Sequence, residues 1–389
     1  MTYRETFLRG HTVYNILLCI YIHIYINEMI FNIAKEDVGK YIFALGVVII
    51  ASYFANKLKA RFDNKERDDY EMVKQYLLND SPLYGYNKPK LWIHTKYELN
   101  ARKWRDFYSR TTTDLNQPYI HQTIRSIIEH CGNDFHICLI DDDSFGKLIP
   151  TWDADLLGMA EPAKSHFRDY GLTQLVYYYG GMIVPNTFLC LKNLKPLYDS
   201  GVGIGRGINP SVGSGDGVFI CEGLNRAMNK LGDKRLTFVP DIYMMGANKN
   251  NDVVKGLAEH IRGIAANPHF TGEPDFKGDI SQWCVATVKQ GFMTLVGGEL
   301  LGIKNRRTSQ PILLEDLLDE GYLEISPEAY GIYIPEDEVL KRPKYQWFAV
   351  MPVDQILSSN LIIAKYMKIS MVNLEGVRNV TSGQSISAL

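Results

Sequence analysis

The first 62 residues are much richer in apolar positions than the rest of the chain. Two apolar stretches stand out, residues 14–34 and residues 38–56, and the second contains "YIFALGVVIIASYFA". This second stretch has about the 20 residues that a membrane-spanning helix needs, and Lys40 and Lys57 can reach the two interfaces. We therefore predict a transmembrane helix in this segment.

The first apolar stretch carries three polar side chains that are costly in lipid, His23, Asn27 and Glu28. It is therefore either a second span packed against its neighbour or a helix lying in the membrane interface, and the pattern favours a hairpin of two spans. No small-residue cleavage site follows, so a secretory signal peptide fits poorly. A pair of buried core helices is the remaining alternative, because both stretches are close to the minimum length of a span.

Basic residues indicate how the predicted anchor is oriented. They are most frequent directly after the second stretch, at Lys57, Lys59, Arg61, Lys65 and Arg67. An excess of lysine and arginine marks the cytoplasmic side of a membrane protein. We therefore predict an anchor over residues 1–62, membrane lipid as its partner, and a cytosolic globular domain, whereas glycosylation at the Asn379 sequon would require a lumenal one.

Beyond the anchor, the hydrophobic pattern changes twice. Residues 63–88 read as a short amphipathic stalk helix followed by a linker with proline and glycine. From residue 89, strand patterns ("KLWIH", "FHICLIDDD", "MIVPNTFLCL") alternate with helix patterns ("QTIRSIIEHC", "AKSHFRDYGLTQLVYYYGG"). This alternation predicts an α/β domain over residues 89–375 with a largely parallel sheet, and leaves residues 376–389 as a flexible tail.

Composition and charge exclude one class of function. With a formal net charge of −2 and no long basic stripe, the chain lacks the electrostatic footprint of a nucleic-acid-binding protein. The six cysteines are scattered singly, without CxxC pairs or the spacing of metal ligands. We interpret them as core thiols in a reducing compartment, which agrees with a cytosolic domain.

Candidate binding residues follow three of the predicted strands. His94 closes the first strand, three acids from Asp141 to Asp143 follow the second, and Pro185, Asn186 and Thr187 stand at the end of the third. Ligands of α/β sheets bind beyond the carboxyl ends of the strands. His94 is either a nucleotide contact or a hydrogen-bonded structural histidine, and the acids are either ligands or a helix cap.

The block "SHFRDYGLTQLVYYYGGMIVPNTFLCLKNL" (165–194) resembles the sugar-binding region of DXD-containing glycosyltransferases, especially the capsular polysaccharide synthesis type. Asp169, the Gly180–Gly181 pair and Thr187 match that region, and the likeness extends over about residues 88–300. The resemblance implies a GT-A fold, in which a Rossmann-like nucleotide-diphospho-sugar half is joined to an acceptor half. It also implies a set of nucleotide-sugar-binding residues: His94, Asp141, Asp143, Asp169, Asn186 and Thr187.

Two departures from the family pattern fall where its chemistry would be. Pro185 stands at the first DXD aspartate and Leu172 stands where the family has an arginine. Mg²⁺ and Mn²⁺ need hard oxygen ligands to hold a diphosphate, and proline offers neither a carboxylate nor an N–H. We therefore predict no metal site and no cofactor. Mn²⁺ or Mg²⁺ would be expected only if the protein were an active transferase. Neither Arg168 nor Arg206 is placed by the sequence to supply the missing charge.

Catalytic residues are unknown from the sequence alone. Asp216 and Asp279 are candidate acids on predicted loops of the acceptor half, although a lone loop aspartate is more often a turn residue.

Two functional hypotheses follow. The first is a membrane-anchored, glycosyltransferase-like pseudoenzyme that serves as a binding or structural component. The alternative is an active, metal-independent glycosyltransferase that moves a sugar from a nucleotide sugar to a glycan or lipid acceptor. The abundance of Ile, Asn, Lys and Tyr is typical of an AT-rich genome and suggests a large DNA virus. In that case the protein would lie at the internal membrane of a virion and contact other virion or membrane proteins.

Overall fold

The computed structural model describes residues 88–95, 117–150, 152–203, 217–225, 237–266 and 273–371. The chain divides into two compact units, residues 1–69 and 70–389, and every described residue belongs to the second. Within the described ranges, no helix combines the length and apolar character that a membrane span requires. The two spans predicted before residue 62 lie outside these ranges, as do the tail and Asp216.

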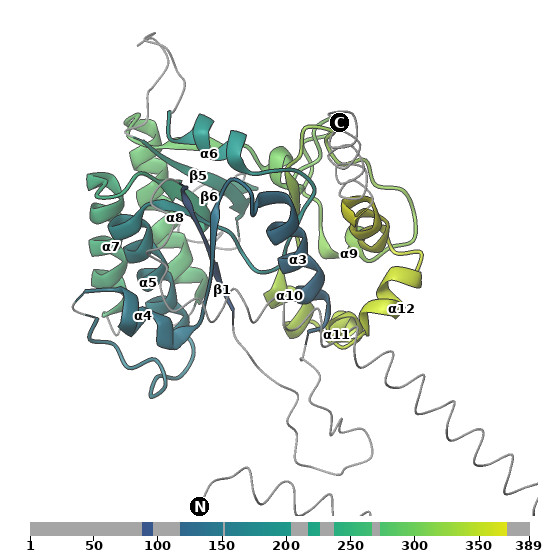
Figure 1. Ribbon diagram of the computed structural model, residues 1–389, viewed down its shortest axis with the longest axis horizontal. Coiled ribbons are helices and arrows are strands. Elements are labelled where there is room, and N and C mark those ends of the chain that lie inside the picture. Colours follow the sequence, from purple (N-terminus) through teal and green to yellow (C-terminus); the bar gives the residue numbers. More distant parts are fainter. Residues whose placement is uncertain are drawn as a thin grey trace, which may run out of the picture. The chain divides into compact units, whose positions relative to one another are not determined.

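A sheet forms the centre of the described unit (Figure 1). It has six strands in the order β2–β1–β3–β6–β5–β7. Its strands are β1 (Lys90–His94), β2 (His136–Ile140), β3 (Gly181–Ile183), β5 (Val218–Leu224), β6 (Phe238–Ala247) and β7 (Thr294–Val296). β1 runs parallel to both β2 and β3, and β5 runs parallel to β7. β6 is antiparallel to β3 and β5. The prediction of an α/β domain is therefore confirmed, with a parallel-rich mixed sheet.

Helices cover both faces of this sheet (Figure 1). One face packs against α4 (Asp142–Leu148), α5 (Ala163–Tyr179), α7 (Asp252–Ala265) and α8 (Glu273–Lys289). The other packs against α3 (Tyr119–Cys131) and α6 (Lys195–Gly201). Successive strand residues alternate between the two cores, as strand geometry requires: Trp92 faces the first, whereas Leu91 and Ile93 face the second. The five described cysteines are all buried and free, which confirms their interpretation as core thiols.

A second, two-stranded antiparallel sheet pairs β4 (Phe188–Cys190) with β8 (Gly331–Tyr333). Its neighbours are η1 (Gly298–Leu301), α9 (Leu314–Leu317), α10 (Glu336–Lys341), η2 (Pro343–Tyr345), α11 (Gln346–Ala349) and α12 (Val353–Ser358), followed by a helical segment over residues 362–371. Apart from η1, whose Leu301 packs in the core on the α3 side of the central sheet, the apolar side chains of these elements form a third core, which includes Leu189, Ile332 and Phe348.

The prediction of one strand over "MIVPNTFLCL" is wrong, because the segment forms two strands in different sheets. β3 ends at Ile183, and a turn follows in which the Phe188 N–H donates to the Pro185 carbonyl at 3.0 Å. Proline has no N–H to donate to a neighbouring strand, so the central sheet does not continue through this position. β4 then leaves for the second sheet.

The glycine pair between α5 and β3 is required by close backbone contacts. Gly180 ends α5 with φ of 70°, and Gly181 begins β3 with φ of 97°. A Cβ on Gly181 would lie 2.1 Å from the Lys90 carbonyl oxygen of β1. The Trp92 indole N–H donates to the Gly180 carbonyl at 3.0 Å, which fixes the end of α5 against β1.

Candidate functional site

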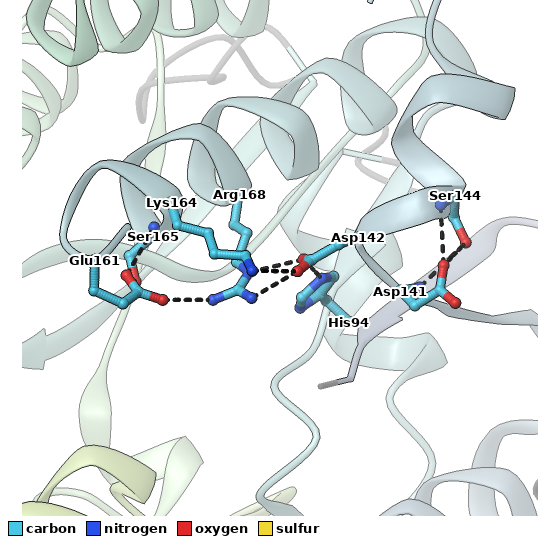
Figure 2. Close-up of polar contacts among 8 residues, drawn as sticks. All are labelled: His94, Asp141, Asp142, Ser144, Glu161, Lys164, Ser165 and Arg168. Carbon is cyan, nitrogen blue, oxygen red and sulfur yellow. Dashed lines mark hydrogen bonds and ion pairs between the residues drawn. The ribbon is translucent and has the colours of Figure 1, made fainter. Parts of the chain in front are cut away.

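The carboxyl ends of β1 and β2 lie side by side, since His94 is in register with Ile140. Asp142, the first residue of α4, follows β2 after a single intervening residue. This arrangement places His94 Nε2 2.9 Å from Asp142 Oδ1 (Figure 2). The imidazole ring also stacks on Phe145 of α4, with ring centroids 5.4 Å apart. His94 is therefore held by both a hydrogen bond and a ring contact.

Two basic side chains from α5 converge on the same carboxylate (Figure 2). Arg168 donates to both Asp142 oxygens, from Nε to Oδ1 at 2.7 Å and from Nη2 to Oδ2 at 2.6 Å. Its remaining Nη1 donates to Glu161 Oε1 at 2.8 Å. Lys164 Nζ lies 3.8 Å from Asp142 Oδ2, within ion-pair but outside hydrogen-bond distance. Arg168 thus makes a bidentate contact with one carboxylate and a single contact with another.

The network keeps Asp142 and Arg168 charged. Burial alone would raise the pKa of the Asp142 carboxyl, but the hydrogen bonds from Arg168 and His94 outweigh burial and hold this pKa well below its usual range. Burial alone would lower the pKa of Arg168, yet its contacts with Asp142 and Glu161 raise it above the ordinary arginine value. Two acidic and two basic side chains therefore neutralise one another at this edge of the sheet.

The two acids that flank Asp142 do not join this network. Asp141 caps α4: its Oδ1 accepts from the Ser144 N–H at 2.9 Å and from the Ser144 hydroxyl at 2.6 Å. Asp143 is exposed on the first turn of α4. Of the three consecutive acids, only the middle one contacts His94 and Arg168.

Asp169 and Asp279 lie on two helices of the same face. Asp169 of α5 accepts a hydrogen bond from Lys277 Nζ of α8 at 2.5 Å. The prediction of a loop around Asp279 is wrong, because this residue lies within α8. Phe276, Ile280 and Cys284 are buried at helical spacing, and their contact with the sheet explains why this segment is a helix.

Asn186 and Thr187 occupy the turn after β3, at the same sheet edge as His94, since β3 pairs with β1. Their side chains are buried, with 8% and 1% of the residue surface exposed. The Thr123 hydroxyl of α3 donates to the Asn186 carbonyl at 2.5 Å, and the Ile334 N–H donates to the Thr187 carbonyl at 3.2 Å. The turn is thereby attached to α3 and to the segment that follows β8.

The sequence pattern gave no role to Glu161 or Lys164, did not distinguish Asp142 from its two acidic neighbours, and did not place Arg168 near a site. One signal points to Arg168. It precedes Leu172 by four positions, so both lie on the same face of α5 about one helical turn apart. A basic side chain thus occurs one turn before the position at which the resemblance places an arginine. In the part of the chain that the structure describes, no group of three or more His, Cys, Asp or Glu side chains is arranged to hold a metal ion.

Comparison with solved structures finds a likeness to a glycosyltransferase. No family model matches the chain, and no curated protein matches it. A solved structure described as "PaToxG Glycosyltransferase" is similar over 58% of this chain and 83% of its own, at 12% sequence identity and a TM-score of 0.28. The class of the protein rests on its own topology: it is a mixed α/β protein with a parallel-rich central sheet and a self-paired charged network at the carboxyl ends of β1 and β2.

Proposed function

We propose that this chain is a membrane-anchored, glycosyltransferase-like pseudoenzyme of the GT-A type that serves as a binding or structural component. The observation that carries the proposal is the pairing of Arg168. All three of its nitrogen atoms donate to the chain's own carboxylates, Asp142 and Glu161. A transferase needs cations that can meet a departing diphosphate, and this arginine is already neutralised.

The resemblance in residues 165–194 and the layered α/β architecture support the GT-A assignment. The parallel strands β2, β1 and β3, with α4 and α5, supply a Rossmann-like half, and the second sheet with its helices supplies the other half. On this reading, a nucleotide sugar would lie at the carboxyl edge near His94 and Asn186. Membrane lipid and other virion or membrane proteins are the expected partners.

The charge balance at this edge disfavours catalysis. A diphosphate could engage Arg168 only by displacing Asp142, and it would have to replace both of the hydrogen bonds that Arg168 donates to this carboxylate. Pro185 supplies no ligand for a metal ion that might replace the arginine. Loss of one charge-stabilising group commonly lowers a rate by on the order of 10²-fold or more, so two losses leave little activity.

One contact favours the alternative, an active and metal-independent transferase acting on a glycan or lipid acceptor. Lys164 Nζ stands 3.8 Å from Asp142 Oδ2, and its side chain is 21% exposed. This ammonium group can turn toward a bound phosphate without breaking a hydrogen bond to Asp142. On this alternative, Lys164 would be the cation that meets the diphosphate.

Calorimetric titration of UDP and GDP into the purified full-length protein, with and without Mn²⁺, tests the proposal. We expect Mn²⁺ to leave the affinity for both nucleotides unchanged. We also expect the Pro185→Asp variant to show no sugar transfer, with Pro185→Ala as the matched control for loss of the ring. Clear Mn²⁺-dependent nucleotide binding by the unmodified protein would contradict the pseudoenzyme proposal and favour an active transferase.

A further inference from the structure

The Asp142 carboxylate is held in the way that proteins hold a bound anion. Side chains from two separate elements surround it: His94 at the end of β1 and Arg168 on α5 donate hydrogen bonds, and Lys164 on α5 lies within ion-pair distance (Figure 2). Arg168 makes the two parallel N–H···O contacts that are typical of carboxylate and phosphate recognition. Together they form a cradle, defined here as His94, Lys164 and Arg168.

We propose that this cradle is an anion-binding site for a phosphate group, and that the chain's own Asp142 occupies it. The inference does not depend on the glycosyltransferase resemblance, because it rests only on the contacts of these four side chains. A phosphate-bearing ligand would take the place of the carboxylate and accept the same hydrogen bonds. Asp142 therefore acts as a built-in competitor of the ligand.

The charges around the cradle favour an anion. Without the Asp142 carboxylate, Lys164 and Arg168 would place two positive charges beside the vacated space. Arg168 would then keep its ion pair with Glu161. Glu161 lies toward solvent, with 54% of its side chain exposed, so water weakens the electrostatic effect of its charge more than that of the less exposed cradle residues. The low pKa of the Asp142 carboxyl agrees with this, because it shows that the surroundings favour negative charge there.

Access and local structure also permit an exchange. The side chains of His94, Arg168 and Lys164 are 10%, 10% and 21% exposed, so each member of the cradle keeps some contact with solvent. The start of α4 does not depend on the Asp142 side chain, because Asp141 and Ser144 cap the helix reciprocally. The Asp142 carboxylate can therefore be removed without removing the helix cap.

Removal of the competing carboxylate provides the test. The full-length protein and its Asp142→Ala variant are titrated with inorganic phosphate at constant ionic strength set with chloride, by calorimetry and by thermal unfolding. Asp143→Ala is the matched control, since it removes an equal charge from the adjacent, exposed position. We expect Asp142→Ala to bind phosphate at least about tenfold more tightly than either the unmodified protein or Asp143→Ala. Asp142→Ala combined with Arg168→Met should lose this gain.

Several results would overturn the proposal. Equal phosphate affinity in the unmodified protein, Asp142→Ala and Asp143→Ala would show that Asp142 blocks no site. A gain that persists in the double variant would place the anion elsewhere. If Asp142→Ala is unfolded in chloride, the proposal requires that phosphate restore its circular dichroism spectrum to that of the folded protein. A spectrum that stays unfolded in phosphate would also overturn the proposal. These titrations contain neither nucleotide nor metal, so their outcome is independent of the nucleotide test of the pseudoenzyme proposal.

Discussion

Replacement of Gly181 by alanine should be among the most damaging single changes in the described domain. Gly181 begins β3 with φ of 97°, in a region that residues with a side chain rarely adopt. A Cβ at this position would lie 2.1 Å from the Lys90 carbonyl oxygen and 2.8 Å from its carbonyl carbon. Both contacts are with main-chain atoms of β1, so no side chain can move aside to relieve them.

The expected loss of stability follows from these two effects. Alanine at positive φ costs roughly 1–2 kcal/mol, and forcing extra volume into a packed interior costs roughly 1–3 kcal/mol. The reduced entropy of the unfolded chain returns about 0.4–1 kcal/mol. We therefore expect Gly181→Ala to lower the free energy of unfolding by about 1–4.5 kcal/mol, against the roughly 5–15 kcal/mol typical of a domain.

Urea unfolding of the full-length protein, followed by tryptophan fluorescence, measures this loss. Trp92 is fully buried and hydrogen-bonded to the Gly180 carbonyl, so its emission reports on this part of the sheet. Gly263→Ala is the control: Gly263 is exposed on α7 and a Cβ there meets nothing within 4 Å, so this variant should gain about 0.5–1 kcal/mol. A Gly181→Ala variant as stable as the unmodified protein would refute the steric argument.

Three further predictions concern acid stability, topology and domain boundaries. Because Asp142 has a lowered pKa in the folded protein, its pairing with Arg168 stabilises the fold above about pH 4 and loses this effect as the pH falls. On acidification, the free energy of unfolding of Asp142→Asn should therefore fall by about 1–2 kcal/mol less than that of the unmodified protein, a value discounted for partial exposure. Urea titrations at a series of pH values measure this difference. We expect residues 14–56 to anchor the protein, so carbonate extraction should leave it in the membrane fraction, and glycosylation at Asn379 would contradict a cytosolic domain. A fragment that begins at Ser81 should fold as one protease-resistant unit, and an aggregated or protease-sensitive fragment would show that the boundary is wrong.

The hydrophobic pattern was sufficient to predict the elements that frame the site. β1 carries three consecutive buried residues, Leu91 to Ile93, as expected for a strand covered on both faces. Ile124, Ile127 and Ile128 of α3 are buried at helical spacing, as their sequence positions indicate. These features are local, so they can be recognised in a single sequence.

The charged network could not be predicted in the same way. Three consecutive acids look equivalent in the sequence, and only the start of α4 at Asp142 decides which one turns toward His94. The partner, Arg168, follows 26 positions later, and its contact depends on how α5 packs beside α4. Pairing of this kind is a property of the tertiary structure, which explains why the resemblance directed attention to Asp141 and Asp143 instead.

The pairing of β4 with β8 has a consequence for how the protein is made. Cys190 is in register with Gly331, 141 positions later in the chain. At synthesis rates of about 5–20 residues per second, a growing chain needs roughly 7–28 seconds to produce the partner of β4. During that interval the apolar side chains of Phe188 and Leu189 have no second strand beside them, although both are fully buried in the finished protein. The second sheet can therefore be completed only after β8 has emerged from the ribosome, long after the elements that pack on the other side of β4.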